Sequence, residues 1–195
     1  QDLIRYMRET ENQLQILLCE LAAYLHNKDM EINVWDQIIA FEGRMHEFIK
    51  AAYDYQDNTF HSHPGYYIDY FEMRLAQLQV LHNLHYEIKK IRKMPKQALV
   101  IADYIMYMAD YVVEMNIPDQ QIEKLEEISE QMKQEELPKT REEFEGRALL
   151  YHILMDLEEF LVYKKRFVNG LDEKKLRIYW KQEMEQKDSA NELQK

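Results

Sequence analysis

The chain has 195 residues, enough for one domain with its own hydrophobic core, and its 4 glycines and 4 prolines leave few turn residues for the many short strands of an all-β fold. Its formal net charge of −11 disfavours binding to nucleic acid or to anionic lipid surfaces, which attract clustered Lys and Arg. We therefore expect an all-α protein that does not bind nucleic acid.

The first predicted helix spans about residues 2–27. Its apolar stripe, broken only by Glu11, consists of Ile4, Met7, Leu14, Leu18, Leu21 and Leu25. The single cysteine, Cys19, lies in this helix and can form no internal disulfide. Gln1 stands where a complete chain would begin with Met, and the helical pattern starts at once, so we expect a further part of the protein upstream.

The second predicted helix begins near Trp35 and fades into the polar, aromatic stretch 53–63. Pro64 and Gly65 then break the chain. A third helix follows over about 66–93, and it ends in a run of cations that suits a helix C-terminus, namely Lys89, Lys90, Arg92 and Lys93.

The fourth predicted helix covers about 96–116 and carries two neighbouring apolar stripes, so we expect it to be packed on several sides. The first stripe is Ala98, Ile101, Ile105, Met108, Val112 and Met115, and the second is Leu99, Ala102, Met106, Ala109 and Val113. A fifth helix opens at Pro118 and runs to about Gln134. Its apolar stripe is thin and surrounded by acidic residues, which predicts an outer position.

The sixth predicted helix covers about 141–168 and begins at a capping box, in which Thr140 accepts from the backbone of Glu143 and Glu143 reaches back. Its two apolar stripes are Phe144, Ala148, Tyr151 and Met155, and Leu150, Leu154, Leu157 and Leu161. Gly170 ends it. A weaker, charged helix is expected over 171–187, with the apolar contacts Leu176, Tyr179, Trp180 and Met184.

These elements together predict an all-α, antiparallel helical bundle of five to seven helices. Residues 1–170 form the single bundle domain, and the first, third, fourth and sixth helices supply its core. Residues 171–195 form the charged C-terminal helix and a frayed tail.

Two histidine pairs are candidate metal ligands. His61 and His63 lie in a predicted loop near Asp57, and His82 and His85 share a helix face. Neither pair comes with a Cys or with a second motif of ligand spacing, and the Glu-x-x-His pattern of di-iron bundles is absent. We expect ordinary loop and helix histidines and no bound metal.

No sequence motif indicates catalysis. The chain lacks a Gly-rich phosphate loop, a G-x-S-x-G motif and a C-x-x-C motif. We therefore predict that it is not an enzyme, that it has no catalytic residues and that it needs no cofactor.

The fourteen tyrosines suggest one candidate binding site. A groove between the third and fourth helices could accept a planar aromatic acid, with Arg74 holding its carboxylate, and be lined by Tyr66, Tyr67, Tyr70, Tyr104, Tyr107 and Tyr111. The alternative is structural packing, because a tyrosine can bury its ring while its hydroxyl stays wet. Arg74 could likewise form a salt bridge within the domain.

Two stretches resemble a known family. Residues 70–78, YFEMRLAQL, look like the aromatic, Met-Arg and Gln-containing segment of the C-terminal domain of the putative aromatic acid exporters. Residues 137–150, LPKTREEFEGRALL, with LEEFL at 157–161, resemble the last long helix of the same domain. The likeness covers residues 1 to about 168. The family consists of bacterial membrane proteins related to fusaric-acid-resistance-type transporters.

The resemblance implies an N-terminal membrane-spanning half as the principal partner, a position at the cytoplasmic face of the bacterial membrane, and a role in transport. The chain itself is not expected to insert into the membrane, because its most apolar stretch is broken by Asp103, Asp110 and Glu114. A homo-oligomer is possible. Two functions stay open: a non-catalytic module that assembles, gates or regulates the membrane half, and a sensor domain that binds a small aromatic acid.

Overall fold

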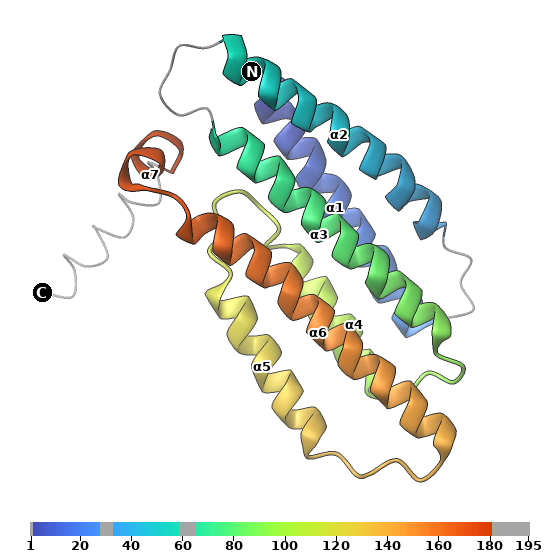
Figure 1. Cartoon of the computed structure of the whole chain (residues 1–195). Helices are drawn as coiled ribbons and strands as arrows, with labels where there is room; N and C mark the ends of the chain where they lie inside the picture. The colour runs from blue at the N-terminus through green and yellow to red at the C-terminus, as the bar shows by residue number, and fades with distance from the viewer. Residues whose placement is uncertain (1, 28–32, 59–64, 181–195) are drawn as a thin grey trace, which may run out of the picture.

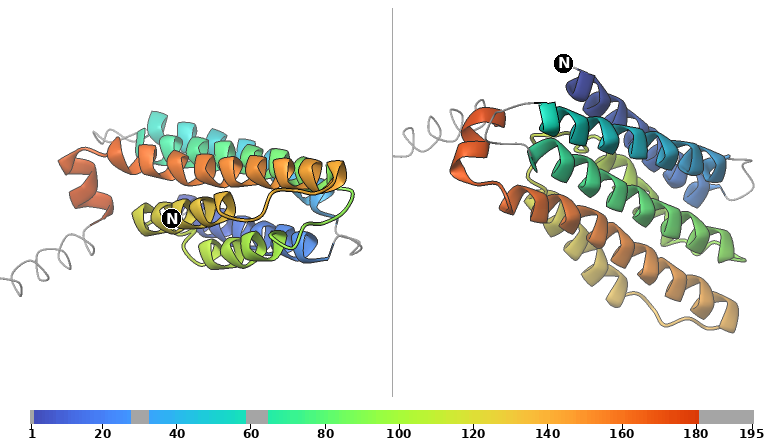
Figure 2. Two further views of the ribbon diagram at one scale, coloured as in Figure 1. Left: turned by 90° about the horizontal axis from the view of Figure 1, so that it is seen from below. Right: turned by 45° about the horizontal axis from the view of Figure 1, so that its top comes forward.

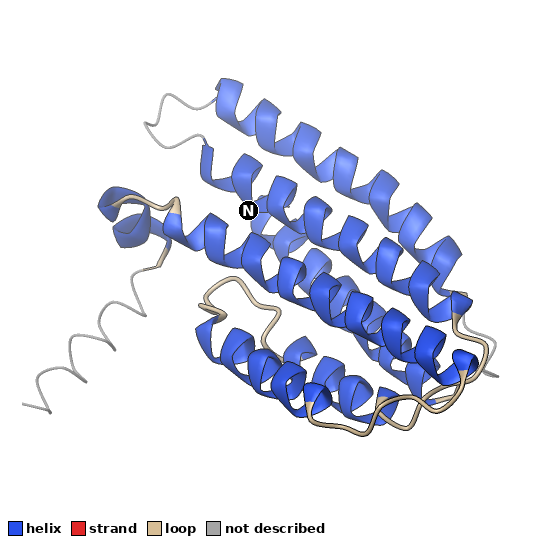
Figure 3. Ribbon diagram, turned by 60° about the horizontal axis from the view of Figure 1, so that its bottom comes forward, coloured by secondary structure: helices blue, strands red, loops and turns tan. Residues whose placement is uncertain are grey.

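The computed structural model describes residues 2–27, 33–58 and 65–180. Within these ranges the chain forms seven helices and no strand (Figures 1 and 3). They are α1 (Asp2–His26), α2 (Val34–Asn58), α3 (Gly65–Lys90), α4 (Ala98–Ala109), α5 (Asp119–Lys133), α6 (Arg141–Asn169) and α7 (Glu173–Tyr179). The predicted all-α bundle is confirmed.

Six of these helices form two packed layers. One layer holds α2, α3 and α6, and the other holds α1, α4 and α5 (Figure 2). Within the layers α3 packs most extensively on α6, and α1 on α4, while α1 also packs on α2 and α3 of the opposite layer. The core lies between the layers, because each long helix turns its apolar face inward.

The buried face of α1 differs in two respects from the predicted stripe. Ile4 is half exposed, whereas Leu3 and Leu17, which the predicted stripe left out, are buried. Glu11, which interrupts the stripe in the sequence, is itself buried. A charged residue in that position needs partners on other helices.

The prediction that the fourth helix continues to residue 116 is wrong. α4 ends at Ala109, and the next backbone bonds are tight ones, from Tyr111 N to Met108 O at 3.0 Å and from Val112 N to Ala109 O at 3.2 Å. Lys164 of α6 binds the segment that follows, because its Nζ donates to the carbonyls of Val113, Glu114 and Asn116 at 2.8, 2.8 and 2.9 Å. These carbonyls are therefore satisfied by a tertiary contact.

The start of α6 confirms the predicted cap. Thr140 Oγ1 accepts from Glu143 N at 3.1 Å, and Glu143 Oε2 reaches back to accept from Lys139 N at 2.7 Å. Gly146, in the second turn, lets the α3–α4 connection approach closely. A Cβ there would lie 3.0 Å from Pro95 Cγ and 3.2 Å from Lys93 O, so a larger residue would push this segment away.

Replacing Thr140 by alanine is expected to lower the free energy of unfolding by about 1 kcal/mol, because the first turn of α6 loses its side-chain acceptor. Urea unfolding followed by circular dichroism measures this. Ser129→Ala, inside α5, is the matched control and should change stability by less than about 0.5 kcal/mol. Equal losses in the two variants would contradict the role of the cap.

The short helix α7 lies across the end of the bundle, near the start of α3 (Figure 1). It begins at Asp172, whose carboxylate accepts from Lys175 N at 2.7 Å. Of the helix expected over 171–187, the structure describes residues 171–180, and 173–179 of them are helical; Met184 lies outside the described residues. Trp180 follows α7 and is buried in the bundle.

Candidate functional site

Four polar side chains form a hydrogen-bonded network inside the otherwise apolar bundle. We call this set the interior charge network: Glu11 of α1, with Tyr70, Arg74 and Gln77 of α3. The three α3 residues are spaced at i, i+4 and i+7, which places them on one helix face. Arg74 is only 1% exposed. A guanidinium at this depth is stable only when hydrogen bonds replace its lost water.

The hydrogen bonds of the network connect three helices. Arg74 donates from Nε to Tyr70 Oη at 3.0 Å and from Nη1 to Gln77 Oε1 at 2.8 Å. Gln77 Nε2 donates to Phe160 O of α6 at 2.8 Å. Tyr70 Oη donates to Glu11 Oε1 at 3.2 Å, since burial raises the pKa of Tyr70 and keeps its hydroxyl protonated. The network therefore ties α1, α3 and α6 together.

Arg8 closes the network at its solvent-exposed edge. Its Nη1 donates to both oxygens of Glu11, at 3.1 and 2.9 Å, and these bonds raise the pKa of Arg8. Its Nη2 lies 3.9 Å from Glu114, in the segment that follows α4. Burial raises the pKa of Glu114, while the charge of Arg8 opposes that rise. Arg8 thus links α1 to the α4–α5 connection.

A second buried group adjoins this connection. Trp180 Nε1 donates to Tyr66 Oη at 3.0 Å, and the Tyr66 ring stacks on Tyr179 with centroids 3.9 Å apart. The Lys164 ammonium lies 5.7 Å from the Trp180 ring. The end of the chain described by the structure is thereby attached to α3 and α6.

The structure divides the residues of the predicted groove into two groups. Those of α3 face other partners: Tyr67 contacts Tyr55 and Tyr179, Tyr70 contacts Phe167, and Arg74 belongs to the interior charge network. The others lie toward α5: Tyr104 Oη donates to Gln121 O at 2.6 Å, Lys124 lies 3.9 Å from the centroid of the Tyr107 ring, and Tyr111, which follows α4, packs on Tyr107. α3 and α4 share no extensive contact, so the two groups do not line one groove.

Burial raises the pKa values of several of these tyrosines. It raises the pKa of Tyr67 to about 12, and it also raises the pKa values of Tyr66 and Tyr104. All three hydroxyls therefore stay protonated at neutral pH. Binding of an aromatic acid to the tyrosines and Arg74 remains a prediction.

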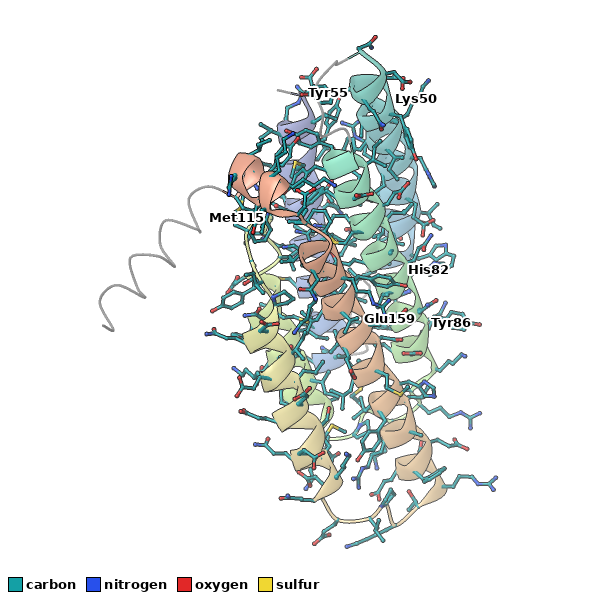
Figure 4. The ribbon with its side chains drawn as sticks, turned by 60° about the vertical axis from the view of Figure 1, so that its left-hand side comes forward. Lys50, Tyr55, His82, Tyr86, Met115 and Glu159 are labelled. Carbon is teal, nitrogen blue, oxygen red and sulfur yellow. The ribbon has the colours of Figure 1, made fainter. Side chains whose placement is uncertain are left out.

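The histidines singled out in the sequence have separate surroundings. His82 lies 3.8 Å from Glu42 and makes an edge contact with Trp35, on the outer side of α3 together with Tyr86 (Figure 4). His85 is buried, and burial lowers its pKa. His61 and His63 lie outside the described residues. Across the described ranges, no three His, Cys, Asp or Glu side chains gather in a way that could hold a metal ion.

A carboxyl pair that the sequence analysis did not single out joins α3 to α6. Glu87 Oε2 and Asp156 Oδ2 are both buried, and neither accepts a hydrogen bond from another described residue. Burial, followed by the contact with Asp156, raises the pKa of Glu87 to about 8, and burial also raises the pKa of Asp156. The pair therefore holds one shared proton at neutral pH.

This pair predicts a pH-dependent stability. The pKa of Glu87 rises from 4.5 to about 8 on folding, so the stability that its proton contributes is fully present below about pH 4.5 and is lost as the pH rises through 8. Glu87→Gln keeps a hydrogen-bond donor that cannot ionise. At pH 9 we expect this variant to exceed the wild type in stability by about 1–2 kcal/mol, a value reduced for partial solvent exposure.

Urea unfolding at pH 5, 7 and 9 measures the effect. The matched control is Glu158→Gln, which removes an exposed carboxylate from the same helix as Asp156. If Glu87→Gln and Glu158→Gln follow the same pH profile, the shared proton has no bearing on stability.

Sequence reasoning missed Glu11, Gln77 and Lys164 as interior residues. A signal was present in two cases: Glu11 interrupts the apolar stripe of α1, and Lys164 follows Leu157 and Leu161 at helical spacing. A charge inside an apolar stripe indicates a buried ionic contact. Its partner could not be named, because it lies on another helix.

The chain is similar to proteins of one known family. The family model described as "Putative aromatic acid exporter C-terminal domain" matches residues 1–165. The chain is 27% identical over 170 residues to a Bacillus subtilis (strain 168) protein named "Uncharacterized protein YqjA". The match covers 85% of this chain and 51% of that relative, so the chain spans about half the relative's length.

A solved structure shares the fold. It is titled "Crystal structure of putative membrane protein from Clostridium difficile 630", and it matches with a TM-score of 0.74 and 24% identity. The match covers 85% of this chain and 98% of that one. In the part of this chain that the structure describes, no helix combines the length and the apolar content needed to cross a membrane.

Proposed function

The chain belongs to the family of putative aromatic acid exporter C-terminal domains, and from this membership we propose that it is a non-catalytic regulatory module of a bacterial membrane protein. It lies on the cytoplasmic side and acts on a membrane-spanning half that precedes it. Its work is mechanical: it couples rearrangements of the bundle to the transporter through α1. The family description and the half-length match to the B. subtilis relative support this reading.

The position of α1 is the observation that carries the proposal. α1 packs on α2, α3 and α4, and its Glu11 is held by Tyr70, with Arg8 bridging the same carboxylate to the surface. A helix fixed on several sides and joined to the preceding membrane half would transmit motion as a rigid element. The close contact of α1 with the segment after α4, through Gln15 Nε2 and Val112 O at 3.1 Å, extends the coupling to the α4–α5 connection.

A flexible linker tests this coupling. A Gly-Ser insertion immediately before Asp2, in the full-length membrane protein, leaves the bundle intact and removes the stiff joint. We expect loss of efflux of an aromatic acid and loss of cellular resistance to it. The same insertion between Pro138 and Lys139, in the α5–α6 connection, is the matched control and should preserve export.

Deletion of the whole domain completes the experiment. If deletion abolishes export while the linker before Asp2 leaves it at the wild-type level, the domain acts as an independent partner and not through α1. If deletion changes nothing, the domain has no part in transport.

A further inference from the structure

An open groove of about 800 Å³ runs between α1, α4 and the start of α2. Ile16, Cys19 and Ala23 of α1 form one wall at helical spacing, and Ala109 and Asp110 form the other. Leu99 and Met106, seven residues apart on one face of α4, are 44% and 49% exposed. Both belong to the second stripe of the predicted fourth helix. Apolar residues gathered on one surface indicate a docking site.

Acidic side chains accompany this apolar surface. Asp103 and Asp110 are exposed on α4 and form no ion pair with any other described residue. Glu20, on the α1 side, accepts from Gln37 through Oε1, while its buried Oε2 has no hydrogen-bond partner within the described ranges. The groove therefore offers a line of negative charge flanked by apolar residues.

The negative charge of the groove affects the pKa of the single cysteine, Cys19. Burial raises the pKa of Cys19, and the negative charges of Asp110 and Glu20 raise it further. The two carboxylates thus act on the same point in the groove, from helices on opposite sides.

We propose that the groove between α1 and α4 binds a cationic amphipathic helix supplied by the membrane half of the protein, an inference that rests on the proposed function. A helix with one line of Lys or Arg between apolar residues matches the acidic line and its apolar flanks in both charge and shape. Cytoplasmic segments next to membrane helices are enriched in Lys and Arg, so the membrane half is the natural source.

A second copy of the chain fits this surface less well. Pairing two α4 helices about a two-fold axis would bring the acidic lines of Asp103 and Asp110 into one interface, where like charges repel. α4 contains no lysine or arginine that could compensate for this repulsion.

The first test uses a synthetic helical peptide of about 16 leucines and lysines, with the lysines on one face. Fluorescence anisotropy measures its affinity for the chain. Occupancy should also slow alkylation of Cys19 by iodoacetamide several-fold, measured by mass spectrometry. The double variant Asp103→Lys/Asp110→Lys should weaken binding at least about tenfold, because two attractive contacts become repulsive.

A second double variant with the same change in net charge distinguishes an effect of the groove from an effect of the overall acidity of the chain. Glu126→Lys/Glu127→Lys alters the net charge by the same amount on the exposed face of α5 and should weaken binding less than about threefold. Equal weakening in the two variants, or unchanged Cys19 alkylation, would overturn the groove as the site. Circular dichroism confirms that each variant is folded.

The second test identifies the source of the helix. A photo-cross-linker on Cys19 in the full-length membrane protein should attach to a Lys- or Arg-rich segment upstream of residue 1. Attachment to a second copy of residues 1–195 overturns the proposal. Failure here leaves the linker experiment unaffected, since coupling through α1 requires no helix in this groove.

Discussion

Replacing Arg74 by methionine should lower the free energy of unfolding by about 3–5 kcal/mol. Methionine fills much of the same volume, but it removes the donors to Tyr70 and Gln77 and the cation 4.0 Å from Glu11. The remaining polar groups stay buried without their partner, and an unpartnered buried group costs more than the original bond contributes. Chemical denaturation of the purified chain measures the loss.

The double variant Glu11→Leu/Arg74→Met distinguishes a charge network from simple loss of volume. If the two residues act as a pair, its destabilisation will be clearly smaller than the sum of the single effects. Additive losses would show that Glu11 and Arg74 contribute independently. Arg44→Met, at an exposed ion pair with Glu9, serves as the surface control and should produce a much smaller change.

Replacing Lys164 by methionine should lower the free energy of unfolding by about 2–4 kcal/mol. The ammonium is the shared donor to three carbonyls of the α4–α5 connection, and the side chain is only 4% exposed. Without it these carbonyls lose their donor, and the connection must rearrange. Amide hydrogen exchange over residues 110–118 should therefore accelerate along with the loss of global stability.

Lys165 provides the matched control for this prediction. It is the next residue in α6, and its exposed ion pair with Asp119 spans 2.7 Å. Lys165→Met should cost at most about 1 kcal/mol. If the two lysines prove equally sensitive, the carbonyls after α4 do not depend on Lys164.

The features that the sequence predicted correctly are local ones. Thr140 and Glu143 lie within one turn of each other, so the start of α6 can be read from their spacing. The third helix, expected from about residue 66, likewise begins at Gly65. Helical periodicity was sufficient for the number and order of the long helices, because each must bury one face.

The features that escaped prediction depend on which helices become neighbours. The tyrosines of α3 and α4 have the right spacing for a shared groove, yet α3 packs on α6 and α4 packs on α1 and α5. In the sequence, Glu11 only interrupts the apolar stripe of α1, because Arg74, which lies 4.0 Å from it, belongs to another helix. Residues 110–116 have the composition of a helix, yet α4 ends at Ala109 and Lys164 of α6 binds the carbonyls that follow.

The contact of Lys164 also imposes an order on folding. Hydrogen bonds within a helix form in well under a millisecond, whereas Lys164 reaches Glu114 only after the chain has closed a loop of 50 residues. Before α6 docks, nothing interrupts the apolar stripe that continues through Val112 and Met115. We expect the newly formed helix to extend past Ala109 and to unwind when α6 arrives, so that the boundary of α4 is one of the last parts of the backbone to reach its native conformation.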